Sequence, residues 1–296
     1  MTDFSTLAGR PTKITARGFG WTHAGRTQPA LADIDLVIEP GERVLLCGDS
    51  GSGKSTFLAA IAGVLGSDEE GTRTGEILLE DSTGAVEEPG HSIPVGLVLQ
   101  DPDSQVISAR VGDDIAFGCE NLAYPREEIW RRVAAAKDLV GPFVDLDFPT
   151  ERLSGGQKQR LALAGVIAMG AGVVLLDEPT ANLDPAGARD VVRAVSALVE
   201  ETGATLVVVE HQHTAWEGLL DRAVEIAHGR IVADGPFEQI ARRRRVEELP
   251  QARELGDGAA REGDAALWSK DLVTRFGPPR TISLPAGAST VITGPN

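Results

Sequence analysis

A glycine-rich run that carries one lysine and several hydroxyl groups is the part of the sequence that most directly suggests chemistry. It follows an apolar, strand-like segment at 43–47 and precedes a helix-like segment at 55–65, which is the context that a phosphate-binding loop requires. Glycines let backbone N–H groups curl around phosphate oxygens, a lysine reaches the β- and γ-phosphates, and Ser55 can bind Mg²⁺. We therefore expect a phosphate loop formed by Gly48, Asp49, Ser50, Gly51, Ser52, Gly53, Lys54, Ser55 and Thr56.

Acidic and amide side chains stand at the ends of two other apolar segments. Asp177 closes the segment 173–177 and can hold Mg²⁺, directly or through water, while Glu178 beside it can polarise a nucleophilic water. Gln100 directly follows the segment 95–99, and its amide can bind Mg²⁺ or contact the same water. The alternatives are a solvated acidic turn and an ordinary polar residue at the end of a strand. The predicted metal ligands are thus Ser55, Gln100 and Asp177.

A Ser-Gly-Gly turn opens a further helical segment, in the run Leu153-Ser154-Gly155-Gly156-Gln157. Such a turn presents several backbone N–H groups and a hydroxyl to one point, and the start of a helix adds a partial positive charge that suits phosphate. The simpler alternative is a capped helix, because serine is a preferred N-cap residue. The candidate nucleotide contacts here are Ser154, Gly155, Gly156 and Gln157.

Composition and charge limit the partners of the chain. The 296 residues carry a formal net charge of −16 and an isoelectric point near 4.7, so the surface on average repels nucleic acid, and we predict no nucleic-acid partner. Cys47 and Cys119 are isolated, which indicates buried thiols rather than a disulfide framework or a zinc site. The longest apolar stretch, 161–176, is broken by glycines and too short for a membrane span. With no signal peptide visible, these features predict a cytoplasmic protein that reaches membranes through partners.

Strand-like and helix-like segments alternate along most of the chain. Strands are expected at 12–19, 34–38, 43–47, 75–79, 95–99, 173–177 and 205–209, and helices at 55–65, at 113–140 with a break at Pro125, after Ser154, and at 185–201. Strands that alternate with helices imply an α/β fold with a largely parallel sheet and right-handed crossovers.

The LSGGQ run ahead of the 173–178 segment, together with the phosphate loop, resembles the ATP-hydrolysing domain of ABC transporters, and the resemblance covers about 14–240. It implies ATP and Mg²⁺ as cofactors. It also implies a P-loop NTPase fold, with a RecA-like core around a parallel sheet, an N-terminal antiparallel β subdomain and a small helical subdomain that carries LSGGQ. In this family two ABC halves close head to tail on ATP. The implied partner is therefore a second ABC domain of the same chain or a second copy in a homodimer.

The same resemblance assigns roles to residues that spacing alone leaves open. His211, 33 residues after Glu178, is similar to the family's switch histidine, which senses the γ-phosphate, so Glu178, His211 and Gln100 are the predicted catalytic residues. Trp21 stands where the family places an aromatic ring that stacks on adenine, and a ring packed in the core is the alternative. Residues 182–184 resemble the family's D-loop.

The segment after Gln100 narrows the resemblance to one subfamily. Gln100-Asp101-Pro102-Asp103-Ser104-Gln105, followed by 114–118, resembles the ATPases of energy-coupling-factor (ECF) and cobalt-type importers, which usually have Asn where Asp101 stands. The resemblance implies that Gln100 to Ile107 receive a coupling helix from integral membrane transporter subunits at the inner face of the cell membrane. The implied cargo is a vitamin or a metal ion. The alternative is a soluble tandem ABC ATPase that acts on ribosomes or nucleic acid.

An internal repeat predicts a second domain. Residues 282–296 parallel 36–50, with Gly287 matching Gly41 and Gly294 matching Gly48. We therefore expect an ABC ATPase domain at 10–241, a charged linker at 242–266 and the start of a second, truncated ABC domain at 267–296. A decorative strand pair is the alternative for 267–296. The arginine run 242–245 is expected to be a solvated helix end rather than a nucleic-acid or lipid patch, because glutamates follow it closely.

Overall fold

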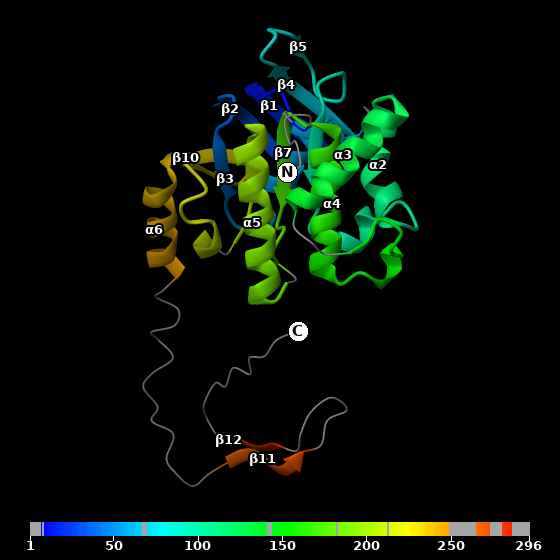
Figure 1. Ribbon diagram of the computed structural model, residues 1–296. Helices are drawn as coiled ribbons and strands as arrows, with labels where there is room; N and C mark the ends of the chain where they lie inside the picture. The colour runs from blue at the N-terminus through cyan, green and yellow to red at the C-terminus, as the bar shows by residue number, and fades with distance from the viewer. Residues whose placement is uncertain are drawn as a thin grey trace. The chain divides into compact units, whose positions relative to one another are not determined.

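The computed structural model describes residues 7, 9–66, 70–140, 144–181, 183–211, 213–248, 265–272 and 280–285. The chain divides into two compact units, 1–241 and 242–296, and each is considered by itself. The first unit contains two sheets and a group of helices, coloured from blue to yellow in chain order in Figure 1.

The central sheet of the first unit has the strand order β10-β9-β3-β8-β7-β6. Neighbouring strands are parallel from β9 (Arg222–Ala227) through β3 (Arg43–Cys47), β8 (Thr205–Val209) and β7 (Val173–Asp177) to β6 (Val95–Val98), and β10 (Arg230–Pro236) pairs antiparallel with β9. The inner strands are continuous apolar runs because a parallel sheet is covered on both faces. The carboxyl ends of parallel strands meet at one edge, which is where such sheets bind ligands.

Alternate residues of β7 face two different cores. Val174 and Leu176 belong to a cluster that includes buried side chains of α4 (Gly155–Met169) and α5 (Pro185–Thr202). Val173 and Leu175 belong to a second cluster, which includes α1 (Lys54–Ala62) and the antiparallel sheet. Figure 1 shows α4 and α5 on one side of β7. The central sheet is therefore the middle layer of the unit, as the apolar run 173–176 requires.

The second sheet of the unit is antiparallel and has the order β2-β1-β4-β5. Its strands are β1 (Lys13–His23), β2 (Leu31–Ile38), β4 (Gly71–Glu80) and the short β5 (Val86–Glu87). Burial in β2 follows the alternating pattern of a strand with one face in the core, where Ile34, Leu36 and Ile38 are buried. The buried side chains of this sheet belong to the same core cluster as those of α1.

A helical group lies beside the central sheet. α2 (Val111–Asn121) and α3 (Arg126–Leu139) both pack on α4. Pro125 precedes α3 in an extended conformation, which confirms the predicted break, because proline lacks the N–H that a continuous helix needs. Three short 3₁₀ turns, η2 (Pro102–Gln105), η3 (Thr150–Arg152) and η4 (His213–Trp216), connect the longer elements. The predicted α/β fold, with its antiparallel β subdomain and its helical subdomain, is confirmed.

The last helix of the first unit, α6 (Phe237–Glu248), runs through residues 242–245, where the sequence predicts a solvated helix end. Phe237 and Ile240 are buried and anchor the first turn of α6. The arginines and glutamates that follow are good helix formers, so the helix extends beyond its anchored part. Cys47 and Cys119 are both buried, as predicted.

The second unit contains β11 (Ala265–Leu272) and β12 (Arg280–Pro285), which pair antiparallel with Trp268 opposite Ser283. β2, whose end the internal repeat matches to this region, also pairs antiparallel with the strand before it, β1. Residues 286–296, on which the predicted second phosphate loop falls, lie outside the described residues, so the second domain stays a prediction. Among the described residues, no helix combines the length and the apolar character that crossing a membrane would take.

Candidate active site

The phosphate loop joins β3 to α1. Its residues Gly48, Gly51 and Gly53 have φ angles of 141°, 77° and 109°, in the region that favours glycine. A Cβ at Gly48 would lie 2.1 Å from the carbonyl oxygen of Ile226, so no larger residue fits there. α1 begins at Lys54, and in the described part of the chain no side chain caps it. The N–H groups of its first turn are therefore left for a ligand, and the start of a helix suits an anion.

Lys54 and Ser52 supply the polar groups of this loop. The Lys54 side chain is buried, and its ammonium group donates hydrogen bonds of 2.9 Å to the carbonyl oxygens of Gly48 and Asp49. The Ser52 hydroxyl is buried and has no hydrogen-bond partner among the described residues. An unpaired buried hydroxyl costs about 1–3 kcal/mol. A phosphate oxygen would satisfy that hydroxyl, so the loop fits the ligand that its sequence predicts.

Ser55 and Asp177 bring two oxygen donors together at the edge of the loop. The Ser55 hydroxyl is hydrogen-bonded to the Asp177 carboxylate. Burial raises the pKa of Asp177, and the hydrogen bond from Ser55 opposes that shift. Mg²⁺ prefers hard oxygen ligands and takes its remaining ligands from water and substrate phosphates, so this pair fits Mg²⁺. No cluster of three or more acidic, histidine or cysteine side chains that could hold a metal occurs in the described ranges.

Glu178 links the two other predicted catalytic residues. Gln100 Nε2 donates a hydrogen bond of 3.1 Å to Glu178 Oε2, and His211 Nε2 lies 3.1 Å from Glu178 Oε1. The Glu178 side chain is 20% exposed, which leaves its carboxylate accessible to water. Its backbone φ is 48°, a left-handed conformation that costs a non-glycine residue energy and is typical of active sites. A carboxylate held between an amide and an imidazole can take a proton from a water.

Sequence reasoning does not single out Glu210, yet this residue joins two parts of the site. Glu210 is 3% exposed, and its carboxylate accepts hydrogen bonds from the Thr180 hydroxyl and, at 2.9 Å, from the backbone N–H of His211. The turn that follows Glu178 is thereby fixed to the residue that approaches Glu178 from β8. The signal in the sequence is an acidic residue that directly continues the buried run 205–209.

The LSGGQ motif forms the start of α4. The Ser154 hydroxyl accepts a hydrogen bond of 3.4 Å from the backbone N–H of Gln157, and the Gln157 side chain accepts one of 2.8 Å from the backbone N–H of Ser154. This reciprocal pair is a capping box, which was the simpler alternative for the motif. Ser154 and Gly155 are also exposed, so contact with a nucleotide of a second ABC domain stays a prediction. Asn182 of the predicted D-loop lies outside the described residues.

Trp21 is packed in the core. The side chain is 3% exposed, its Nε1 donates a hydrogen bond of 3.1 Å to His23 Nδ1, and the two rings meet edge to face. A Cβ at Gly71 would lie 2.3 Å from the indole, so the neighbouring strand packs directly on the ring. An adenine needs a ring face that it can cover. The structure therefore favours the packing alternative, and stacking of Trp21 on adenine stays a prediction.

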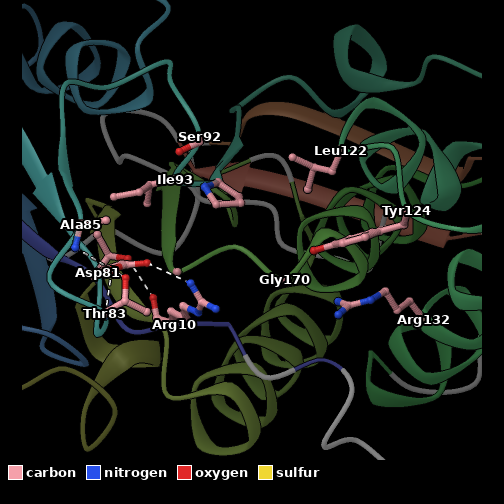
Figure 2. Close-up of a pocket in the computed structure, with 13 residues that line it drawn as sticks. Arg10, Asp81, Thr83, Ala85, Ser92, Ile93, Leu122, Tyr124, Arg132 and Gly170 are labelled. Atoms are coloured by element: carbon pink, nitrogen blue, oxygen red, sulfur yellow. Dashed lines mark hydrogen bonds and ion pairs between the residues drawn. The ribbon is translucent and has the colours of Figure 1, made fainter.

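A pocket of about 520 Å³ lies away from these residues and is drawn in Figure 2. Arg10 and Asp81 lie on one side of it, and Tyr124 and Arg132 lie on the other. The hydrogen bond from the Thr83 hydroxyl lowers the pKa of Asp81 to about 2, and Arg10 pairs with the same carboxylate at 3.3 Å. The Arg132 guanidinium lies 4.5 Å above the Tyr124 ring. The pocket is lined by none of the predicted site residues, so it is not the phosphate site.

A glycine-rich loop between a parallel strand and a helix, with an Asp-Glu pair at the end of a nearby parallel strand, defines a P-loop nucleotide-binding protein. A family model described as ABC transporter matches residues 31–181. An energy-coupling factor transporter ATP-binding protein, EcfA1 of Caldanaerobacter subterraneus subsp. tengcongensis, is 36% identical over 249 residues, which are 80% of this chain and 86% of that protein. The chain belongs to the ABC transporter family of ATP-binding proteins and is an ATPase of that family.

Two further similarities differ in how much of the related protein is matched. A relative from Methanosarcina acetivorans is 39% identical over 226 residues, and the match spans 76% of this chain and about a third (35%) of that protein. The structure of cbiO1 from Clostridium perfringens, part of the ABC transporter complex cbiONQ, has a TM-score of 0.66 and 30% identity, and covers 81% of this chain and 94% of that one. The predicted resemblance to ECF and cobalt-type ATPases is thus confirmed as a similarity.

Proposed function

We propose that this ABC ATPase is the energy-coupling subunit of an ECF-type importer for a vitamin or a metal ion. The similarities to an energy-coupling factor ATP-binding protein and to cbiO1 support this proposal. The observation that carries it is an apolar surface beside the loop that begins at Gln100. ATP hydrolysis at one end of that loop and partner binding at the other would then share one structural element.

This apolar surface, which we call the η2–α2 patch, is formed by the exposed side chains of Leu99, Ile107 and Phe117, beside the loop and on α2. Ile107 is 61% exposed, and its backbone N–H donates a hydrogen bond of 2.8 Å to the Asp114 carboxylate in the first turn of α2. Phe117 follows Asp114 by one helical turn and therefore lies on the same side of α2. Large apolar side chains gathered on a surface mark a binding site, and a short amphipathic helix is a partner that suits such a patch. We propose that the helix belongs to an integral membrane subunit.

The nucleotide chemistry follows from the site residues. We propose that Lys54 pairs with the β- and γ-phosphates of ATP and that Ser55, Asp177 and the amide oxygen of Gln100 hold Mg²⁺, which would neutralise phosphate charge. Glu178 is the proposed general base. His211 is the proposed γ-phosphate sensor, since its ring already lies beside the Glu178 carboxylate.

A complete site of this kind needs an LSGGQ motif from a second ABC half. We propose that the exposed start of α4, with Ser154, Gly155 and Gly156, completes the phosphate site of a second ABC domain in the same protein or in a homodimer. Donors that surround the γ-phosphate lower the barrier because they meet the charge that develops in the transition state. This arrangement also accounts for the exposure of Ser154 and Gly155 at the start of α4.

The test combines substitution in the patch with assays for partner binding and transport. Ile107→Asp and Phe117→Asp should abolish co-purification with co-expressed integral membrane subunits and abolish cargo uptake in reconstituted vesicles, while basal ATP hydrolysis stays at the parental rate. Val232→Asp is a matched control, because Val232 is 56% exposed on β10, away from the patch. Membrane binding that survives both patch substitutions contradicts the proposal. Stable co-purification with ribosomal RNA instead would favour the soluble tandem ATPase.

A further inference from the structure

The backbone of Leu99 is held by side chains from two different elements. Leu99 directly follows β6 and directly precedes Gln100. The Gln105 carboxamide accepts a hydrogen bond of 2.9 Å from the Leu99 N–H and donates one of 3.1 Å to the Leu99 carbonyl oxygen. This two-bond pairing closes the loop on itself at η2, in the way that a neighbouring strand would hold the same backbone.

The second element is α4, the helix that begins with LSGGQ. Gln159 of this helix donates a hydrogen bond of 3.3 Å from Nε2 to the same Leu99 carbonyl oxygen. One turn of helix separates Gln159 from Gly155, so the bond connects the start of the LSGGQ helix to the residue that precedes Gln100. An ion pair between Lys158 and Asp103 ties the same turn of α4 to η2.

For packing alone, a glutamine at position 159 is less favourable than an apolar side chain. Its side chain is 2% exposed, and in the described part of the chain its Oε1 is buried without a hydrogen-bond partner. A buried unpaired oxygen of this kind costs about 1–3 kcal/mol, whereas an apolar side chain of similar size in its place is close to neutral. The Leu99 carbonyl would still be satisfied by Gln105 after such a change. Stability alone therefore does not account for a glutamine here.

We propose that Gln159 is a positioning residue that couples the LSGGQ helix to Gln100. By holding the Leu99 carbonyl, Gln159 fixes the backbone from which Gln100 Nε2 reaches the Glu178 carboxylate. Under the proposed function, on which this inference rests, LSGGQ serves the ATP site of the opposing half, whereas Gln100 serves the site of its own half. A shift of α4 on engagement of the opposing site would therefore reach the hydrolytic residues of this one through the hydrogen bond from Gln159 to Leu99, which lies beside the Lys158–Asp103 ion pair.

The test is Gln159→Leu, compared with the parent at the same protein concentration. We expect kcat to fall about fivefold, which at 1.36 kcal/mol per tenfold corresponds to about 1 kcal/mol. The nucleotide Kd should stay within about twofold, because Gln159 lies outside the phosphate loop. The melting temperature should be unchanged or higher, because the unpaired buried oxygen is gone. Gln239→Leu, at an exposed position of α6, is the matched control and should leave all three values unchanged.

The decisive measurement repeats the substitution in a Gln100→Ala background. If Gln159 acts through Gln100, Gln159→Leu should cause no further loss of kcat once Gln100 is removed. Losses that multiply in the double variant, or a parental kcat in Gln159→Leu while Gln100→Ala is slow, would overturn the coupling and leave the site assignment intact. A parental kcat in Gln100→Ala would overturn both the assignment of Gln100 and the coupling. A lower melting temperature with unchanged kcat would mean that Gln159 has a packing role only.

Discussion

Replacing Trp21 with alanine separates a packing role from an adenine-binding role. An aromatic side chain of this size buries about 150–250 Å², which at about 25 cal/mol per Å² corresponds to about 4–6 kcal/mol of transfer free energy. Measured losses for such truncations in cores are about 3–5 kcal/mol. The side chain is 3% exposed and packs against Gly71, so we expect the full effect at this site. For a unit of this size each kcal/mol shifts the melting temperature by about 2–4 °C, so Trp21→Ala should lower it by about 6–20 °C.

The assay is thermal unfolding together with ATP titration on the same protein samples. If the ring only packs, the ATP Kd measured below the lowered melting temperature should stay within about twofold of the parent. Stacking on a base would instead cost about 1–3 kcal/mol, or a rise in Kd of about 5- to 150-fold. Trp130→Ala is the matched control, because that tryptophan is 39% exposed and its removal should cost far less stability. A large rise in Kd with an unchanged melting temperature would refute the packing argument.

Three further predictions concern the hydrolytic site. Glu178→Gln should keep ATP binding and slow turnover by about 10²- to 10⁴-fold, the usual contribution of a general base, and a parental rate in the partner-bound protein would remove Glu178 from that role. Turnover per molecule of the isolated chain should rise with protein concentration, and Ser154→Arg should abolish that rise, because the opposing LSGGQ is then blocked; a fast rate that is independent of concentration would contradict the two-half site. Because burial raises the pKa of Asp177 above its ordinary 3.8, Mg²⁺-dependent nucleotide binding should be complete above the raised pKa and weaken as pH falls through it, at higher pH than for an exposed aspartate. Isothermal titration at several pH values should show this dependence in the parent and a flat profile in Asp177→Asn.

Sequence reasoning is most accurate for elements whose local sequence pattern is compatible with only one kind of structure. The run 173–177 is a buried strand, as its uninterrupted apolar residues require, and Pro125 ends one helix before the next begins. The phosphate loop is similarly determined, because glycine at 48 is the only residue that the approach of the Ile226 carbonyl allows. Gln100, Glu178 and His211 were predicted as one catalytic group, and the topology of the parallel sheet brings them within hydrogen-bond distance.

The remaining features depend on contacts between distant segments, which a local pattern does not contain. The burial of Trp21 depends on how closely β4 packs at Gly71, some 50 residues later. Glu210 and Gln159 look like solvated polar residues in the sequence. Their roles emerge only when β8 is placed next to the turn after β7 and α4 next to the end of β6. How far α6 continues beyond residues 242–245 is also hard to predict, since charged residues that form good helices resemble a linker in composition.

At Glu178, the left-handed backbone lowers the stability of the fold, while the side chain is needed for the proposed activity. A non-glycine residue in this region carries roughly 1–3 kcal/mol of strain, and glycine would relieve it while deleting the carboxylate between Gln100 and His211. Selection for heat resistance alone should therefore enrich Glu178→Gly and yield folded proteins that no longer hydrolyse ATP. Efforts to stabilise this protein therefore need an activity assay in parallel, because the substitution that relieves this backbone strain also removes the proposed base.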